Sequence, residues 1–255
     1  MTKEDRQNAI LDQLLTQESV LVSDLATSLD VSLVTIRKDL TELEKAGKLY
    51  RSHGKAILIN PFTNNRSVNE KEKLKAEEKQ LIGAEAVKLL MKDDSIILAS
   101  GTTIHALACN IHAESRLTIV SASLQATMTL AANDNIDIIQ LGGMVRHSSV
   151  SVVGQYSMEI LRGCSFTKLF LGVDGIDLDF GISTTDMREA ELNRSMMNAA
   201  QKTIVLADSS KFGRRGFAKI SGLEDVDIII TDAKIPQFVA NKIEEMGIEL
   251  IIAGS

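Results

Sequence analysis

Seven short, mostly apolar runs in the last two thirds of the chain constrain its fold more than any other feature. They are residues 96–99, 117–120, 136–141, 169–173, 203–206, 226–230 and 248–252. Runs of this kind are typical of strands that are buried on both faces, as in parallel sheets. Helical spacing marks four of the segments between them, residues 104–110, 124–132, 187–200 and 238–246. This part of the chain therefore predicts an open, doubly wound, mostly parallel α/β sheet.

The first 59 residues show a different pattern, that of three short amphipathic helices. Apolar residues recur at three- and four-residue spacing at Ile10 and Leu14, then Leu25 and Leu29, then Ile36, Leu40 and Leu43. Ser32 can cap the third helix with its hydroxyl. After Gly47, a residue typical of helix ends, residues 48–51 and 55–59 predict two strands around a turn. Together these elements predict an N-terminal winged helix-turn-helix unit.

The third helix carries the chemistry of a DNA-recognition helix. Its N-terminal half offers hydroxyl and cationic side chains, which suit base edges and phosphates. An Arg-Lys pair alone indicates only a solvated helix surface, but a capped helix followed by a basic hairpin favours DNA binding. We expect Leu33, Thr35 and Arg37 to lie near bases and the other basic side chains near phosphates. The predicted DNA-binding residues are Ser32, Leu33, Thr35, Arg37, Lys38, Arg51, His53 and Lys55.

The overall charge limits how this contact can work. The chain has 28 Lys and Arg against 34 Asp and Glu, a net charge of -6, which does not favour nonspecific adhesion to nucleic acid. Binding is therefore expected to be local, through the third helix and the hairpin. Because one such module binds weakly, we expect two copies to contact two half-sites of double-stranded operator DNA. This expectation implies a homo-oligomer, either a dimer or a tetramer.

Composition shifts place the domain boundaries. Residues 60–67 are polar and rich in turn formers, and residues 70–79 are densely charged and favour a helix. We predict a DNA-binding domain over residues 1–59, a linker and the start of a connecting helix over residues 60–75, and a ligand-sensing and oligomerisation domain over residues 76–255.

Small polar residues follow five of the predicted strands. In doubly wound sheets, ligands bind at the carboxyl ends of the strands. Hydroxyls, glycines, free helix N–H groups and one lysine suit a phosphate, and an aspartate can accept hydrogen bonds from sugar hydroxyls. The predicted ligand-binding residues are Ser100, Gly101, Thr102, Thr103, Ser121, Ser123, Gly142, Gly143, Asp174, Gly175 and Lys211.

Other classes of site are disfavoured. The chain has neither a Gly-x-Gly-x-x-Gly run nor a phosphate-loop Gly-Lys-Ser/Thr run, so we expect no dinucleotide or nucleoside-triphosphate cofactor. Four histidines and two cysteines show no metal-ligand spacing, so no metal is expected. No secretory or membrane-spanning segment is visible, and unpaired cysteines suit a reducing compartment, so we expect a cytoplasmic protein.

With these residues identified, the chain resembles the DeoR family of transcriptional regulators over essentially its whole length. The N-terminal match depends on Arg6, Ile10, Leu14, residues 31–32, 35–40, Leu43, Gly47, Leu49, Arg51 and residues 53–54. The match in the second domain depends on residues 101–103 and 141–143, Gly154, Gly172, residues 175–177, Gly181 and residues 207–211. The resemblance implies a winged-helix repressor of a carbohydrate-catabolism operon. It also implies a C-terminal domain that resembles ribose-phosphate isomerases and CoA transferases and senses a phosphorylated sugar or related metabolite.

Three positions depart from the family pattern. Ala99 stands where an aspartate is common, Ala122 replaces the asparagine of a Thr-Asn-Ser run, and Lys55 replaces the second glycine of the wing. Loss of a buried hydrogen-bond partner changes affinity by roughly 1–3 kcal/mol, so the effector or its stereochemistry can differ from that of other members. Lys55 either adds a phosphate contact or is merely solvated.

Two alternative functions are weighed against a regulator. An isomerase or acyltransferase with a DNA-binding head needs a base and a polarising cation, which Asp174 and Lys211 could nominally supply. Glu189 and Glu191 lie on a predicted helix with no evident reason to face the strand ends, and the sequence itself shows no base for a nucleophilic site around Cys109 or Cys164. A purely structural oligomer would leave the basic, capped helix unexplained. The sequence therefore favours a regulator that is not an enzyme.

Overall fold

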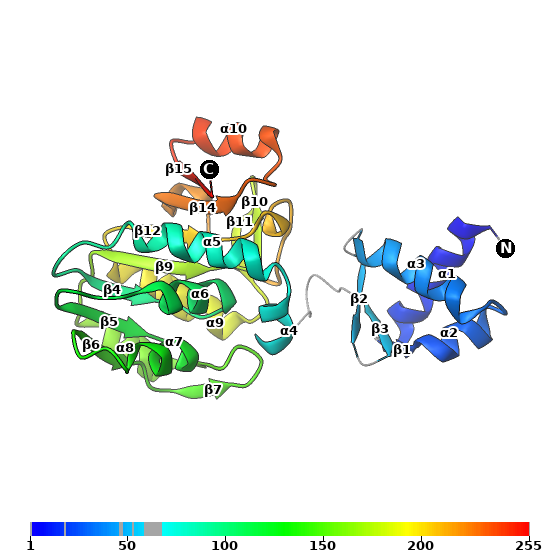
Figure 1. Ribbon diagram of the computed structural model, residues 1–255, viewed down its shortest axis with the longest axis horizontal. Helices are drawn as coiled ribbons and strands as arrows, with labels where there is room; N and C mark the ends of the chain where they lie inside the picture. Colours follow the sequence, from blue (N-terminus) through cyan, green and yellow to red (C-terminus); the bar gives the residue numbers. More distant parts are fainter. Residues whose placement is uncertain (1, 18, 46–47, 53, 59–67, 255) are drawn as a thin grey trace. The chain divides into compact units, whose positions relative to one another are not determined.

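The chain folds as two compact units, which are described separately. The computed structural model describes residues 2–17, 19–45, 48–52, 54–58 and 68–254, and its contacts divide the chain into Met1–Asn64 and Asn65–Ser255 (Figure 1). The boundary predicted at residue 59 falls at the edge of residues 59–67, which lie outside the described part, and the boundary predicted at residue 75 also stays a prediction. None of the helices within the described ranges is long and apolar enough to cross a membrane.

The N-terminal unit is a winged helix-turn-helix. Its elements are α1 (Lys3–Gln17), β1 (Ser19–Leu21), α2 (Val22–Ser28), α3 (Leu33–Lys45), β2 (Leu49–Ser52) and β3 (Lys55–Leu58). The three strands form an antiparallel sheet in the order β1-β3-β2. The apolar residues of the predicted stripes, Ile10, Leu14, Leu25, Ile36, Leu40 and Leu43, are buried in one core. The three predicted helices and both wing strands are thus confirmed, while Gly47 and Ile59 lie outside the described residues.

The second unit is built on a seven-stranded parallel sheet in the order β15-β14-β12-β9-β4-β5-β6. These strands are β4 (Ser95–Leu98), β5 (Leu117–Ser121), β6 (Ile136–Gln140), β9 (Lys168–Gly172), β12 (Thr203–Leu206), β14 (Ile228–Asp232) and β15 (Glu249–Ala253). Each corresponds to one of the seven predicted apolar runs. The predicted doubly wound, parallel architecture is therefore confirmed.

Helices cover both faces of this sheet. They are α5 (Ala76–Val87), α6 (Thr102–Asn110), α7 (Leu124–Leu130), α8 (Gln155–Arg162), α9 (Met187–Ala199) and α10 (Gln237–Glu245), while the short helix α4 (Val68–Lys73) contacts α6. Figure 1 shows α5 and α6 side by side over one face. The sheet has a hydrophobic core on each face, and alternate residues of β4 point into opposite cores. Ile96 and Leu98 belong to the core formed with α5, α6 and α7, whereas Ile97 belongs to the core formed with α8, α9 and α10. Burial on both faces explains why the strands are almost continuously apolar.

Five short strands and two short 3-10 turns complete the unit. They are β7 (Met144–Arg146), β8 (Ser151–Val153), β10 (Gly175–Asp177), β11 (Gly181–Thr184) and β13 (Ala218–Ser221), with turns at Ser209–Lys211 and Leu223–Asp225. β7 pairs with β8, and β10, β11 and β13 form a second antiparallel sheet. These strands are not predicted from the sequence, because three or four residues are too few to show a period.

Candidate DNA-binding surface and ligand site

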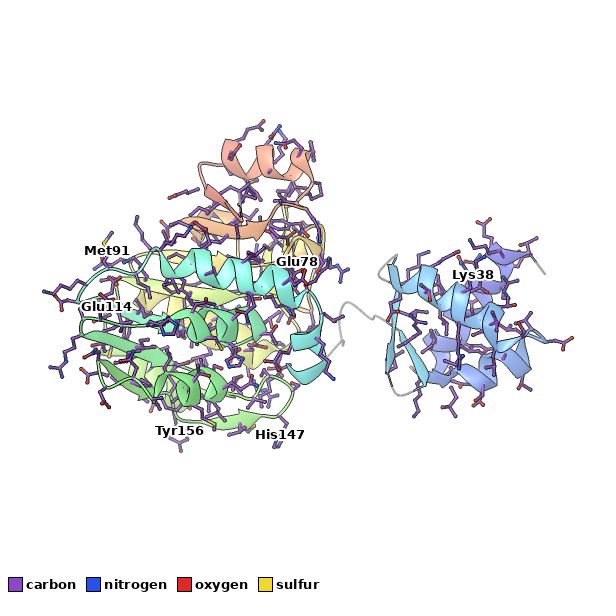
Figure 2. The ribbon with its side chains drawn as sticks, viewed as in Figure 1. Lys38, Glu78, Met91, Glu114, His147 and Tyr156 are labelled. Atoms are coloured by element: carbon purple, nitrogen blue, oxygen red, sulfur yellow. The ribbon has the colours of Figure 1, made fainter. Side chains whose placement is uncertain are left out.

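The start of α3 is capped as the sequence predicts. The Thr35 amide donates a hydrogen bond to Ser32 Oγ at 3.2 Å, and the two hydroxyls lie 2.9 Å apart. Leu33 is 44% exposed, and Arg37 and Lys38 are exposed as well. Figure 2 shows Lys38 on α3. The buried stripe thus leaves these predicted DNA-binding side chains free to meet a partner.

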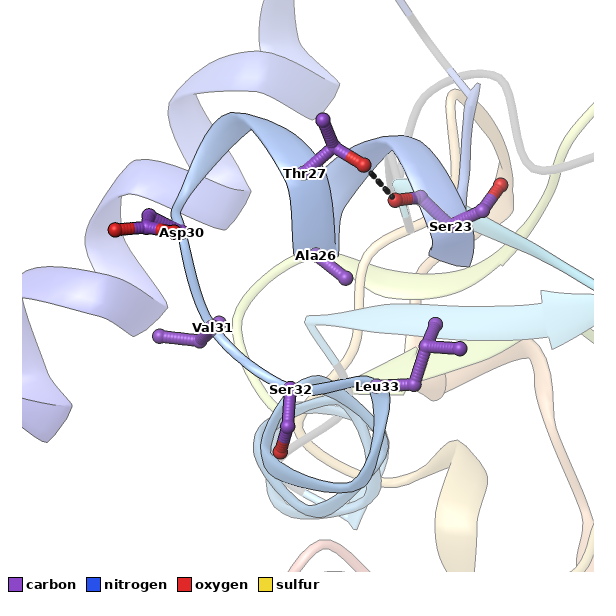
Figure 3. A pocket seen from close by; sticks show the side chains of 7 residues that line it. All are labelled: Ser23, Ala26, Thr27, Asp30, Val31, Ser32 and Leu33. Carbon is purple, nitrogen blue, oxygen red and sulfur yellow. Dashed lines mark hydrogen bonds between the residues drawn. The ribbon is translucent and has the colours of Figure 1, made fainter.

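A shallow depression lies beside this cap. It has a volume of about 500 Å³ and is lined by Ser23, Ala26, Thr27, Asp30, Val31, Ser32 and Leu33. Figure 3 shows that α2 and the turn into α3 form its walls, with the Thr27 hydroxyl donating to the Ser23 carbonyl at 3.1 Å. In helix-turn-helix proteins these two elements meet the DNA backbone and the groove, respectively.

In the wing, Arg51, which is expected near a DNA phosphate, already has a partner within the chain. Arg51 donates from Nη2 to Glu44 Oε2 at 2.7 Å, and its backbone amide donates to Glu44 Oε1 at 3.0 Å. Its guanidinium is therefore already paired with α3, and a phosphate would have to compete with Glu44. Lys55 is exposed. His53 lies outside the described residues.

The predicted ligand residues follow strands β4, β5, β6, β9 and β12. Because the sheet is parallel, the carboxyl ends of these strands lie at one edge. At the end of β4, Gly101 begins α6 with a φ of +117°, a conformation that favours glycine, and no side chain caps the helix. The first N–H groups of α6, at Thr102 and Thr103, are therefore suited to an anion.

Some of the predicted ligand-binding residues have side chains that form hydrogen bonds with backbone groups of the sensor unit. Ser121 Oγ donates to the Leu98 carbonyl at 3.2 Å, and Ser123 Oγ caps α7 by accepting from the Ala126 amide at 3.2 Å. Both serines are buried. Gly143 has a φ of +144°, and a Cβ there would lie 2.5 Å from the Val153 carbonyl oxygen. These residues, with Gly142 beside them, shape the loops after β5 and β6.

Asp174 is the centre of the charged part of the site. Lys71 Nζ donates to its Oδ1 at 2.7 Å, and Thr184 Oγ1 donates to its Oδ2 at 3.2 Å. Burial raises the pKa of Asp174, but the positive charges of Lys71 and Lys211 outweigh it and hold the pKa well below its usual range. The carboxylate is therefore ionised at neutral pH. Gly175 follows directly and begins β10.

Burial lowers the pKa of two lysines in this unit, Lys211 and Lys79. Burial lowers the pKa of Lys211, although the charge of Asp174 raises it. The ammonium of Lys211 forms no hydrogen bond or ion pair with any residue that the structure describes. Burial likewise lowers the pKa of Lys79 to about 8, and its Nζ donates to the Leu74 carbonyl at 2.6 Å and to the Lys71 carbonyl. Sequence reasoning missed Lys71 and Lys79.

Glu189 corrects an expectation. No reason for it to face the strand ends is evident in the sequence, yet its Oε1 accepts from Ser100 Oγ at 2.9 Å and its Oε2 lies 3.0 Å from Thr184 Oγ1, the hydroxyl that also contacts Asp174. Arg146, which is buried, donates to the same Oε2 at 3.1 Å. Thr184 thus lies between the carboxylates of Glu189 and Asp174. Glu191 is exposed, as expected.

This arrangement suits a ligand with both a phosphate and hydroxyl groups. The cations and the uncapped start of α6 favour an anion, and two ionisable carboxyl groups can accept from hydroxyls. Over the described residues, no group of three or more His, Cys, Asp or Glu side chains could hold a metal ion.

The winged helix and the separate α/β unit together define a DNA-binding transcription regulator with a sensor domain. The DeoR-like helix-turn-helix domain model matches residues 6–62, and the DeoR C terminal sensor domain model matches residues 74–233. The chain belongs to the DeoR family of transcription regulators. This result confirms the resemblance found in the sequence, and it identifies a regulator rather than an enzyme.

Relatives of known name match over nearly the whole chain. The putative aga operon transcriptional repressor of Escherichia coli O157:H7 is 35% identical, over 98% of this chain and 94% of the relative. The HTH-type transcriptional repressor GlcR of Bacillus subtilis (strain 168) is 31% identical, over 99% and 97%. Among solved structures, ribose 5-phosphate isomerase A from Methanocaldococcus jannaschii matches 54% of this chain and 55% of that chain, with 17% identity and a TM-score of 0.41.

Proposed function

We propose that this chain is a repressor of a carbohydrate-catabolism operon and that a phosphorylated sugar modulates its binding to operator DNA. The observation that carries the effector part is the ammonium of Lys211, which has no partner among the described residues and lies close enough to Asp174 for the two charges to act on each other. An unpaired, partly buried cation is costly unless an anion binds it. The uncapped start of α6, at the same edge of the sheet, offers further donors.

The sugar part of the effector is assigned to the carboxylates. Asp174 accepts from the Thr184 hydroxyl and Glu189 accepts from the Ser100 hydroxyl, and sugar hydroxyls supply the same chemistry. The phosphate is assigned to Lys211 and to the backbone amides at Thr102 and Thr103. The two relatives named as transcriptional repressors, one of them of an operon, support a regulatory role of this kind.

The DNA part is assigned to the outer side of α3 and to the wing. Leu33, Thr35 and Arg37 contact bases, whereas Ser32, Lys38 and Lys55 contact the backbone. Arg51 and His53 complete the set, with Arg51 leaving Glu44 for a phosphate. Two or four copies of the chain, held by their α/β units, present paired winged helices to two half-sites in the cytoplasm.

A thermal-shift screen tests the effector assignment. The probes are ribose 5-phosphate, glucose 6-phosphate, fructose 6-phosphate and glycerol 3-phosphate, each beside its unphosphorylated parent. A ligand that binds the native state raises the melting temperature by mass action, so at least one phosphate ester is expected to do so while its parent does not. If esters and parents have the same effect, the phosphate assignment is wrong.

A further inference from the structure

Helix α4 reaches the candidate effector site through one side chain. Lys71 lies 103 positions from Asp174 in the sequence, yet its Nζ is 2.7 Å from Asp174 Oδ1. The two side chains are 26% and 19% exposed, so the pair is shielded but still open to a ligand. Lys71 is also close enough to Lys211 for its charge to lower the pKa of that lysine. It therefore lies beside the proposed phosphate position.

Polar contacts hold α4 in place. Of its six residues, the side chains of Lys71, Glu72 and Lys73 are described, and none of them is apolar or buried. Glu72 Oε1 lies 3.2 Å from His105 Nδ1 on α6, and Lys79 donates to the Lys71 carbonyl at the end of the helix. The described contacts of α4 are thus ion pairs and hydrogen bonds, and part-exposed contacts of this kind rearrange at low cost when a charged partner changes.

Both halves of the proposed effector site touch α4. Asp174, which we assign to sugar hydroxyls, pairs with Lys71, and α6, whose N-terminus we assign to the phosphate, contacts Glu72 through His105. A phosphate carries more charge than one carboxylate and has three acceptor oxygens, so it competes well for an ammonium. Sugar hydroxyls meanwhile occupy the lone pairs of Asp174 that Lys71 uses in the unliganded chain.

We propose that Lys71 is itself an effector-binding residue: it leaves Asp174 for the phosphate of the bound sugar, and this exchange moves α4. The inference rests on the proposed function and adds how effector binding in the α/β unit changes DNA binding. In the sequence, α4 is the first described element after the wing strand β3. A change at α4 is therefore a change at the start of the segment that leads to the DNA-binding unit. Because the exchange favours one position of α4, it biases the equilibrium between DNA-binding states.

Three substitutions test this in the full chain: Lys71→Met, Lys71→Arg and, as a matched control, Lys73→Met on the same helix. Amide hydrogen exchange over residues 68–75 is measured without ligand and with the four sugar phosphates named above. Without ligand, loss of a half-buried ion pair is expected to speed exchange roughly three- to tenfold in Lys71→Met, with little change in the other two variants. The affinity of Lys71→Met for the sugar phosphate that stabilises the unmodified chain is expected to fall roughly tenfold.

At saturating sugar phosphate, exchange in α4 changes in the unmodified chain and in Lys73→Met but stays constant in Lys71→Met. Equal behaviour of Lys71→Met and Lys73→Met would overturn the inference alone, since the unmodified chain still responds. If the unmodified chain responds to none of the four esters, the proposed function fails and takes the inference with it. If Lys71→Met does not fold, Asp174→Asn replaces it in the measurement without ligand. This substitution removes the carboxylate that pairs with Lys71, so hydrogen exchange over residues 68–75 is again expected to be faster than in the unmodified chain.

Discussion

The guanidinium of Arg6 donates two hydrogen bonds to the carboxylate of Asp39, and this pair joins α1 to the recognition helix α3. Nη2 lies 3.1 Å from Oδ1, and Nε donates to Oδ2. Asp39 is only 2% exposed, and its hydrogen bonds raise the pKa of Arg6. A planar, two-point pair fixes orientation as well as distance. The position of α3 in the unit is thus set partly by this pair and partly by the core around Ile36 and Leu40.

Asp39→Asn is therefore expected to destabilise the N-terminal unit without removing any proposed DNA-contacting group. The amide cannot accept both hydrogen bonds, and the guanidinium of Arg6 loses its counter-charge. We expect the N-terminal unit to melt about 5 °C lower, measured by circular dichroism. Glu4→Gln, an exposed change of the same kind on α1, is the control. Equal melting temperatures for the two variants would show that the pair does not stabilise the unit.

Arg37→Ala is expected to reduce operator affinity while leaving the fold intact. The side chain is exposed on α3, so its loss leaves no cavity. A bidentate contact with a base contributes about 1–3 kcal/mol of discrimination, which corresponds to roughly a five- to 150-fold change in affinity. Arg162→Ala, an exposed substitution on α8, controls for the loss of one positive charge. Unchanged affinity for a DNA fragment that the native chain binds would remove Arg37 from the interface.

Lys211→Met is expected to leave operator binding intact but to blunt the effect of sugar phosphates on it. The substitution removes the unpaired cation and keeps most of the apolar stem. The same change relieves the cost of burying an ammonium, so the unliganded chain should unfold at the same or a higher temperature. Lys202→Met, on an exposed lysine just before β12, is the control. An undiminished response in Lys211→Met would place the phosphate elsewhere.

Asp186 gives the sensor unit a stability that depends on pH. Hydrogen bonds from Arg188 lower the pKa of Asp186 from 3.8 to about 2, against the effect of burial and with further help from Arg146. Because the folded pKa lies below the unfolded one, the contribution is complete above about pH 4 and is lost as the pH falls towards 2. Discounted for the solvent around Arg188, we expect about 1 kcal/mol.

Asp186→Asn isolates this contribution. Asp186 also caps α9, accepting from the amides of Arg188 and Glu189. Asparagine caps a helix about as well as aspartate, so the substitution removes the charge but keeps the cap. In urea unfolding, Asp186→Asn should have a smaller free energy of unfolding at pH 7 than the native chain, and that free energy should change less between pH 4 and pH 2. Asp134→Asn, at an exposed position, is the reference. Parallel pH profiles for Asp186→Asn and the native chain would contradict the prediction.

The main sheet could be predicted from sequence because burial on both faces makes its strands continuously apolar. All seven runs form strands, and the four helical segments form α6, α7, α9 and α10. The strand order could not be predicted, since β4 and β9 become neighbours through packing between segments more than 70 residues apart. The short strands lack such a pattern: in β10, Gly175 and Asp177 leave Ile176 as the only apolar residue.

The candidate ligand site was only partly predictable, for a related reason. Position after a strand indicates which residues reach the sheet edge, and this rule found Asp174 and Lys211. The same rule does not distinguish hydroxyls that bind a ligand from hydroxyls that bond to the backbone. It therefore also predicts Ser121 and Ser123 as ligand-binding residues, although both hydroxyls form hydrogen bonds with backbone groups of the chain. Glu189 did have a signal, since Asp186 and Glu189 have the spacing of a helix start, which places Glu189 in the first turn of α9.

The most direct test of the account is a titration of the native chain onto DNA from around its own gene, repeated with saturating sugar phosphate. We predict that one fragment is bound in two half-sites and that at least one ester changes its affinity by roughly five- to 150-fold, the range of a typical coupling free energy. The unphosphorylated parent should have no effect. Failure to bind any such fragment, or binding that no sugar phosphate alters, would contradict the claim that the α/β unit controls the winged helix.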